Sequence, residues 1–516
     1  MARPKFISAE ASGYSYFCGI DADFLAAFFV GIGSLLWGYD SGIFGTAQAQ
    51  TYFEEKFHPS SAILGAIISV YTAGGAIGCL LSAPLGNHYG RRGTIQIGAV
   101  IAAVGTTIQT AAVNTAMLIV GRLIAGLAIG IIYFAIPQFQ CEIAPAAHRG
   151  FFVGLHSQFI GFGYAISNWI GFGVYFGHGQ FTFRFPVGLQ VFWAILLLVG
   201  SLFLPRSPRW LIEKGRYEEA KKTLTRLRSS NVDPDYLEKE FTQMRDQIEY
   251  EAEHEETSLL AILRKPSYRK RIILGSLIQI GQQICGISAI NYYQTIMYKT
   301  LGIKGSTVLA LAGVWGLTGP LANIVCLLWI IDRVKRRTLF LWGSIALTVD
   351  IAIVQAIVAV YSGGSNQVAN GIGIFFLILF GVIFSLSWNS GAPVYTTEIF
   401  PTQIRSVGGA ISTFWSFVIQ VVLAQASPTA LTNVGWRYYF FFIACNLVSA
   451  VLVFFFLPET FGKSLEEISE VFGDPFVSIH MDEKLKPTPT VLHYENPDAT
   501  AERKRSPEAN NVEVAI

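Results

Sequence analysis

The sequence predicts an all-α membrane protein in which twelve transmembrane helices form two six-helix halves, joined by a cytoplasmic helical linker. Three observations lead to this fold. Only 14% of the 516 residues are charged, whereas soluble domains carry about 25%. Twelve apolar windows each approach the roughly 20 residues that a helix needs to cross the hydrocarbon core of a bilayer. Three short motifs recur in the same order about 250 residues later, which indicates a duplicated unit with a site between its copies.

Each apolar window is predicted to form one membrane-spanning helix. Six windows precede a polar stretch and lie near 24–46, 62–85, 94–113, 117–138, 150–173 and 187–204. Six more follow it and lie near 272–297, 307–331, 338–361, 371–397, 405–430 and 437–457. The predicted domains are an N-terminal segment, the first half, the linker, the second half and a C-terminal tail, at 1–23, 24–204, 205–271, 272–457 and 458–516.

Positive side chains gather in the loops that follow even-numbered windows. These short loops hold Arg91, Arg92, Arg149, Arg333, Lys335, Arg336, Arg337 and Arg405. The loops after odd-numbered windows hold only Lys56, Arg184, Lys299 and Lys304. Because positively charged loops stay in the cytoplasm, we expect both termini on that side of a multi-pass protein, which we place in the plasma membrane.

Charge and cysteine usage exclude several classes of protein. The net charge of +2 is the balance of scattered loop charges, so no basic patch predicts binding to nucleic acid. The six cysteines lie mostly inside apolar windows and are interpreted as core packing. No nucleophile–base pair or metal-ligand spacing occurs, so we expect neither an enzyme nor a cofactor. The segment 206–271 has charged side chains at helical spacing, and the tail from about 474 is predicted to be disordered.

The repeated motifs predict an intracellular gate. The pattern E-x-x-P-x-x-x-R begins at Glu142 and again at Glu398, and a second charged motif ends at Arg92 and again at Arg337. Ion pairs at the cytoplasmic helix ends would keep the inner side closed. Exposed pairs are worth only about 0–1 kcal/mol each, which suits contacts that break in every cycle. The predicted gate residues are Arg91, Arg92, Glu142, Arg149, Asp332, Arg336, Arg337, Glu398 and Arg405. Arginines that only set topology would not need the repeated glutamates.

Asp40 is an acidic residue inside the first apolar window. An ionised carboxylate is expensive there, so such a residue is usually paired or protonated. Arg122, in the fourth window, is the natural partner. The pair is either a permanent structural contact or a site that responds to protons.

Five motifs of this chain together resemble those of the sugar porter family of the major facilitator superfamily. Other parts of the sequence are typical of fungal members. The resemblance covers about 20–470. Its motifs are Gly121-Arg122 with Gly126 and Gly130; Pro137, Glu142, Pro145 and Arg149-Gly150; Pro205 to Leu211; Gln282-Gln283, Gly286-Ile287 and Tyr292-Tyr293; and Pro458-Glu459-Thr460 with Gly462 and Leu465 to Glu467. The resemblance implies a monomeric secondary transporter in the lipid bilayer. Its substrate would be a sugar or sugar-like solute, moved by alternating access with proton symport through Asp40 and Arg122.

A sugar site in a membrane needs amides, hydroxyls and aromatic faces, because each hydroxyl removed from water must find a partner. Amides offer both donors and an acceptor. The resemblance implies that Gln158, Gln282 and Gln283 face the central cavity and that Tyr292 and Tyr293 form the outer gate. Further candidates for substrate contact are Ser288, Asn291, Trp388, Asn389 and Trp415. Hydrogen bonding between helices is the alternative role for all of these polar residues.

Several positions depart from the family pattern. Ser288 replaces an asparagine, the asparagine expected on the eighth span falls at Pro320, and a tryptophan expected before Glu398 is Pro393. These departures leave the solute open between a hexose and a disaccharide, pentose, polyol or quinate. A facilitative sugar uniporter is a further alternative, as is a non-transporting nutrient sensor. The presence of Asp40 and Arg122 and the short tail favour transport over sensing.

Overall fold

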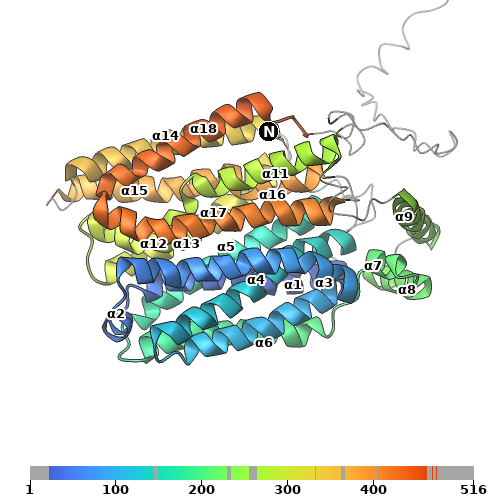
Figure 1. Ribbon diagram of the computed structural model, residues 1–516, viewed down its shortest axis with the longest axis horizontal. Coiled ribbons are helices and arrows are strands. Elements are labelled where there is room, and N and C mark those ends of the chain that lie inside the picture. Colours follow the sequence, from blue (N-terminus) through green and yellow to red (C-terminus); the bar gives the residue numbers. More distant parts are fainter. Residues whose placement is uncertain are drawn as a thin grey trace, which may run out of the picture. The chain divides into compact units, whose positions relative to one another are not determined.

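The computed structural model describes residues 22–144, 149–228, 234–254, 264–331, 333–361, 366–400 and 404–461, together with Ile468 and Phe472. Within these ranges every regular element is a helix, and the long helices run side by side (Figure 1). The predicted all-α fold is therefore confirmed. The end that carries the short helices of the polar stretch is called the inner end, after the predicted orientation, and the opposite end is called the outer end.

The helices before the polar stretch are α1 (Ala22–Ala47), α2 (Thr51–Phe57), α3 (Ser61–Thr110), α4 (Thr115–Ile143), α5 (Arg149–Val174) and α6 (Phe181–Ser201). The polar stretch forms α7 (Pro208–Glu213), α8 (Tyr217–Leu227) and α9 (Pro234–His254). The helices after it are α11 (Pro266–Ile284), α12 (Ile287–Thr300), α13 (Ser306–Val325), η4 (Cys326–Ile330), α14 (Arg336–Tyr361), α15 (Gln367–Phe384), η5 (Ser385–Asn389), α16 (Ser390–Ile399), α17 (Arg405–Asn433), η7 (Gly435–Tyr438) and α18 (Tyr439–Phe456).

Ten helical segments of the described chain are long and apolar enough to cross a membrane. They differ from the twelve predicted windows in two places. Helix α3 runs through two windows in one element of 50 residues, and α5 is not among the ten. Helix α5 carries His156, Gln158 and Asn168 on buried faces, and these polar side chains lower its mean hydropathy. The twelve windows thus correspond to two parts of α3, to α5 and to nine further segments.

Gly90 marks the break between the two parts of α3. Its φ of 76° lies in the left-handed region, which favours glycine. A Cβ at this position would lie 2.9 Å from the ring of Trp210 on α7, and the Trp210 Nε1 donates to the carbonyl of Asn87 at 3.2 Å. Helix α7, the first helix of the linker, therefore packs against α3 at this break.

Helices α3 and α4 pack with their backbones in contact. A Cβ at Gly126 would lie 2.0 Å from the carbonyl oxygen of Tyr71, and one at Gly130 would lie 2.1 Å from that of Gly75. Only glycine allows such an approach, and small residues are the usual means of close helix packing in membranes. The glycine motif of α4 therefore fixes the position of Arg122, which lies on the same helix.

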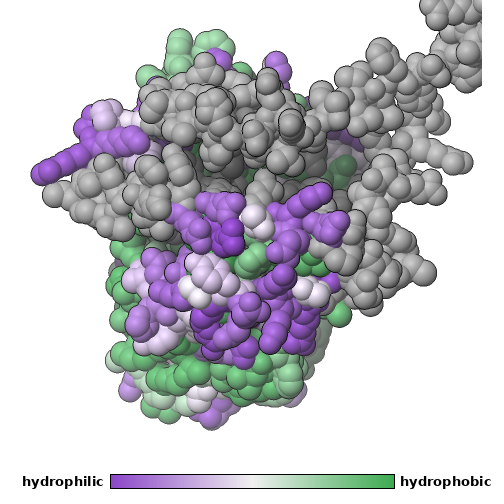
Figure 2. Space-filling view, turned by 90° about the vertical axis from the view of Figure 1, so that its right-hand side faces the viewer, coloured by the Kyte–Doolittle hydropathy of each residue, from purple (hydrophilic) through white to green (hydrophobic). Residues whose placement is uncertain are grey.

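Polar and apolar surfaces are separated as a bilayer requires. Large apolar side chains such as Phe192, Val360 and Phe455 are exposed on the long helices, where lipid would cover them. Hydrophilic side chains gather over the end of the molecule that bears α7 to α9, and hydrophobic ones lie along the adjoining flank (Figure 2). Arg228 attaches the linker to the first six helices. Its guanidinium lies 3.5 Å from Asp23 on α1 and 2.6 Å from Glu240 on α9.

Candidate transport site

The structure pairs Asp40 on α1 with Arg122 on α4. The Arg122 Nη1 donates to the Asp40 Oδ1 at 2.7 Å, and both side chains are almost completely buried. The guanidinium lies over the rings of Phe44 and Tyr71, at 3.9 and 4.1 Å from their centroids, and its Nε donates to the carbonyl of Ile67. Burial makes this pair dependent on its charges, because removing either partner leaves the other uncompensated.

The pair is not fully satisfied. Among the described residues, the Asp40 Oδ2 and the Arg122 Nη2 have no hydrogen-bond partner. Buried polar atoms normally find partners. The contact that holds α1 to α4 therefore leaves one acceptor atom and one donor group without a hydrogen bond. Such a contact can change when the charge of the carboxylate changes.

Gln158 connects the first six helices to the last six. Its Oε1 accepts from the Asn323 Nδ2 at 3.1 Å, and its Nε2 donates to the carbonyl of Pro320 at 3.3 Å. The Asn323 Oδ1 in turn accepts from the Ser390 hydroxyl at 2.5 Å and from the Asn389 Nδ2 at 3.3 Å. We call Gln158, Asn323, Asn389 and Ser390 the amide network. It joins α5 to α13, η5 and α16 through side chains that offer both donors and acceptors.

Gln282 on α11 lies beside this network. Its Nε2 donates to the carbonyls of Trp388 and Asn389 at 3.3 and 3.5 Å, both of which belong to the π-helical turn η5. A π-helical turn changes the local hydrogen-bond pattern and often occurs at functional sites. Gln283, the next residue, is half-buried, and its Oε1 accepts from the Ser288 hydroxyl at 2.6 Å.

Asn291 is placed one turn further along α12 from the Gln283–Ser288 contact. Its Oδ1 accepts from the Trp315 Nε1 at 3.2 Å, and its carbonyl accepts from the Tyr164 hydroxyl at 2.8 Å. Trp415 lies apart: it is 43% exposed, its ring packs on Phe414, and among the described residues no hydrogen bond or ring contact joins it to the amide network. Trp388 is fully buried and packs on Phe340.

An aromatic group faces the boundary between the two sets of helices. The ring of Tyr133 lies 4.9 Å from Trp37, 4.9 Å from His156 and 5.6 Å from Phe417 on α17. The His156 Nδ1 is 2.7 Å from the Ser34 hydroxyl, which sets the orientation of the imidazole. Trp37 and Tyr133 are half-buried. Aromatic rings of this kind offer apolar faces beside the polar groups of a binding site.

Sequence reasoning missed Asn323, Ser390, Trp315 and Tyr133. The signal for Asn323 was an amide inside an apolar window, three residues after Pro320. Residues three apart share a helix face, so Gln158 contacts Asn323 and the carbonyl of Pro320 together. The amide that the family pattern places at Pro320 is therefore supplied nearly one turn later.

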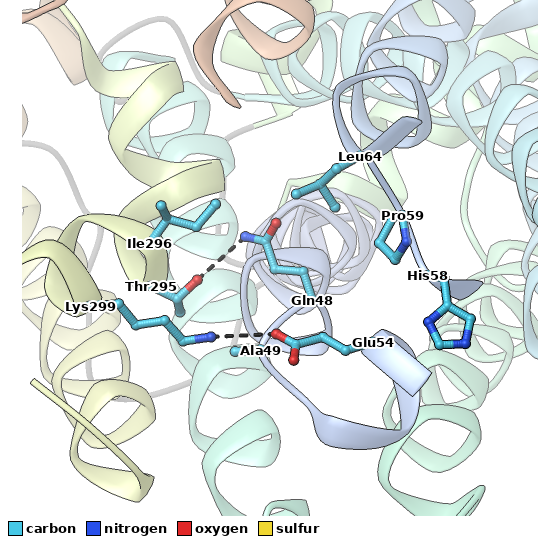
Figure 3. A pocket seen from close by; sticks show the side chains of 9 residues that line it. All are labelled: Gln48, Ala49, Glu54, His58, Pro59, Leu64, Thr295, Ile296 and Lys299. Carbon is cyan, nitrogen blue, oxygen red and sulfur yellow. Dashed lines mark hydrogen bonds and ion pairs between the residues drawn. The ribbon is translucent and has the colours of Figure 1, made fainter. Parts of the chain in front are cut away.

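Contacts of α12 with α1, with α2 and with the loop between them close the outer end, and we call them the outer seam. The Gln48 Nε2 donates to the Tyr292 carbonyl at 2.6 Å, the Thr295 hydroxyl donates to the Gly45 carbonyl at 3.1 Å, and Lys299 lies 3.5 Å from Glu54. Tyr292 is buried, so this predicted gate residue lies within the seam. Figure 3 shows the Lys299–Glu54 pair from close by, together with a hydrogen bond of 3.4 Å that the Gln48 Nε2 donates to the Thr295 hydroxyl.

Tyr293, the second predicted outer-gate residue, turns toward α17. Its hydroxyl donates to the carbonyl of Ala424 at 2.5 Å, and its side chain is completely buried. Helix α12 is therefore fixed at the outer end to α1 on one side and to α17 on the other.

The charged residues of the inner end pair within their own set of six helices. Arg91 contacts Glu142 at 2.8 Å, and Arg336 contacts Glu398 at 3.1 Å. Glu398 also accepts from the Thr460 hydroxyl at 2.6 Å. Among the ion pairs of the described side chains, none at this end joins the first six helices to the last six. The inner end thus lacks, over this part of the chain, the cross-connections that close the outer seam.

The other predicted gate residues have different surroundings. Arg92 donates to the carbonyls of Leu202 and Leu204, both at 2.8 Å, and so caps the end of α6. The backbone of Arg337 donates to Glu459 at 3.1 Å, and its guanidinium donates to the carbonyl of Phe454. Asp332 and the side chains of Arg149 and Arg405 lie outside the described residues.

Comparison with solved structures identifies the fold. The structure of the proton:xylose symporter XylE bound to 6-bromo-6-deoxy-D-glucose is similar over 87% of this chain and 99% of that chain, with a TM-score of 0.73 and 22% identity. The inward-open conformation of XylE from E. coli is similar over 87% of this chain and 99% of that chain, with a TM-score of 0.70 and 20% identity. The fold is therefore that of the major facilitator superfamily.

Sequence comparison identifies the family. The family described as Sugar (and other) transporter matches residues 26–472, and the chain belongs to it. The MFS-type transporter criB of Aspergillus cristatus is 37% identical, over 86% of this chain and 92% of that protein. A high-affinity glucose transporter of Kluyveromyces lactis is 30% identical over 91% and 88%, and a probable quinate permease of Aspergillus niger is 32% identical over 85% and 86%. The protein is a membrane transporter of the sugar porter type and not an enzyme.

Proposed function

We propose that this protein carries a small polyhydroxylated solute across the plasma membrane by alternating access, together with a proton. The observation that carries the proposal is the buried Asp40–Arg122 pair, in which Asp40 belongs to α1, the helix that also takes part in the outer seam through Gly45. The solute would bind between the two six-helix halves, against the amide network and against Gln282 and Gln283. Hydroxyl groups would there replace the hydrogen bonds that the amides now make with one another.

Proton coupling would act through helix α1. Protonation of Asp40 removes its charge and weakens its contact with Arg122, which frees α1 to tilt. The same helix ends at Ala47, next to Gln48 of the outer seam. A tilt of α1 would therefore open or close the seam, so that the proton and the solute control the same movement.

Alternating access also needs an inner closure. The described conformation has a closed outer seam, and the inner pairs Arg91–Glu142 and Arg336–Glu398 remain within their halves. We propose that these side chains, with Arg149, Asp332 and Arg405, exchange partners across the halves when the outer end opens. The side chains of Arg91–Glu142 and Arg336–Glu398 are mostly buried, so new partners across the halves would have to offset the free energy that breaking these pairs costs.

The amide network favours a neutral solute, because Gln158, Asn323, Asn389 and Ser390 carry no charge. A neutral sugar or polyol can satisfy such groups through its hydroxyls, whereas a carboxylate such as quinate would need a cation to offset its desolvation. Relatives named as a glucose transporter and as a quinate permease are similar to this chain to nearly the same degree. Quinate is therefore the second candidate, and a facilitator without proton coupling is the alternative mechanism.

The test is an uptake screen in a yeast strain without its own sugar transporters. Labelled glucose, xylose, a polyol, a disaccharide and quinate are offered at low concentration, with and without a protonophore. We expect accumulation of a neutral solute that the protonophore abolishes, and a tagged protein at the plasma membrane. Uptake that only equilibrates would support a facilitator, and binding without uptake would support a sensor.

A further inference from the structure

The outer seam contains a cavity of about 260 Å³, separate from the amide network. Nine residues line it, and Figure 3 shows their side chains around one space. The first six helices and their loops contribute Gln48, Ala49, Glu54, His58, Pro59 and Leu64, and α12 contributes Thr295, Ile296 and Lys299. The wall therefore consists of both halves of the protein, and the cavity exists in this form only while the outer seam is closed.

Gln48 supplies a polar group that the protein leaves unused. Its side chain is only 7% exposed. The Nε2 donates to the Tyr292 carbonyl at 2.6 Å, but the Oε1 has no hydrogen-bond partner among the described residues. A buried amide oxygen without a partner is unfavourable, and rotation of the amide would let this oxygen accept from a hydroxyl donor in the cavity.

Charged and apolar groups complete the lining. The Lys299 ammonium and the Glu54 carboxylate lie 3.5 Å apart across the mouth, and both side chains are about half-exposed. They offer one donor group and one acceptor group with no net charge. Pro59, Leu64 and Ile296 form the apolar part of the wall. A mixture of paired charges, one free amide oxygen and an apolar wall suits a solute with hydroxyls around a compact carbon skeleton.

We propose that this cavity is a second binding site, for a small neutral polyhydroxylated solute of about the size of a monosaccharide. A ligand here contacts α12 and the first six helices at once, so it binds the closed outer seam and not the open one. By linkage, it holds the outer end closed. The site would therefore slow uptake when the external solute is abundant. The inference shares with the proposed function only the class of solute.

The experiment measures occupancy of the cavity directly. Ala49→Cys places a small thiol in the wall, and Glu55→Cys, on the exposed face of α2 and outside the lining, is the matched control. Each variant is made twice, once with native Gln283 and once with Gln283→Ala, which weakens the central site. A membrane-impermeant maleimide is applied from outside to proteoliposomes, with D-glucose or quinate as the probe. The native protein, whose described cysteines are buried or half-buried, gives the background rate.

We expect D-glucose to slow modification of Ala49→Cys about threefold at twice its dissociation constant, with no change for Glu55→Cys. Adding Leu64→Trp, which fills the cavity, should abolish the protection and leave the Glu55→Cys rate unchanged. The proposal is overturned if D-glucose gives no protection, if quinate alone protects, or if protection persists with Leu64→Trp. Protection seen only with an intact Gln283 would assign the effect to the central site, which overturns this proposal and leaves the proposed function standing.

Discussion

Replacing Asp40 by Asn tests the coupling role of the buried pair. The substitution keeps the shape of the side chain and an oxygen at the position that accepts from Arg122 at 2.7 Å. It removes the negative charge and leaves the guanidinium uncompensated between α1 and α4. Breaking a buried pair by removing one partner costs about 3–5 kcal/mol. The contacts of Arg122 with Phe44 and Tyr71 are present before and after the change, so they do not reduce this loss.

The double variant Asp40→Asn with Arg122→Gln separates charge from function. It contains no buried charge at the site, so neither side chain leaves an uncompensated charge behind. We therefore expect Asp40→Asn to lower thermal stability and the double variant to recover most of it. Both variants should fail to concentrate solute, because neither has a carboxylate at position 40 to carry a proton.

The assay is uptake into energised cells, with and without a protonophore, at equal amounts of protein in the membrane. The wild type should accumulate solute above the external concentration, and Asp40→Asn should stop at equilibration while still exchanging labelled for unlabelled solute. An Asp40→Asn protein that concentrates solute would refute the coupling argument. Wild-type uptake that ignores the protonophore would do the same, and would leave Asp40–Arg122 as a structural pair.

Four other substitutions test the binding site, the inner gate and the helix packing. Gln283→Ala and Asn323→Ala should each weaken solute affinity by about 1–3 kcal/mol, roughly 5- to 150-fold, in a binding assay on correctly delivered protein. Unchanged affinity in both would remove the amides from the site. Glu398→Gln should slow exchange with little change in affinity, and a normal exchange rate would contradict the gate. Gly126→Ala should destabilise the protein by about 1–3 kcal/mol or more, because a carbonyl of α3 lies 2.0 Å from the new Cβ. Gly173→Ala, with open space around it, is the control, and equal melting temperatures would argue against the packing interpretation.

Features that depend on local composition could be read from the sequence. The apolar windows predicted the long helices because a bilayer selects residues by type and length, one segment at a time. The partnership of Asp40 with Arg122 was predictable for a related reason. A charge inside an apolar window needs an opposite charge, and the fourth window offered a single one.

Features that depend on helix rotation and packing were decided only by the tertiary structure. Trp415 and Phe417 are two residues apart, which places them on nearly opposite faces of α17. Phe417 packs against Tyr133, while Trp415 is 43% exposed. The composition of α17 is the same whichever of the two side chains faces the other helices. The sequence therefore could not show which of them is buried. In the same way, Arg92 caps α6 although its motif predicted a gate residue, because free carbonyls lie within its reach.

The amide network shows the same division between sequence and structure. The sequence contained Gln158, Asn323 and Asn389 as isolated amides in three windows, more than 60 residues apart. Their meeting depends on how α5 packs on α13 and on the π-helical turn that precedes α16. The sequence by itself determined which helices form and which buried charge needs a partner, because burial in a membrane acts on each segment separately. The tertiary structure decided which side chains share a site, because that depends on the relative rotation of helices that the chain brings together from distant positions.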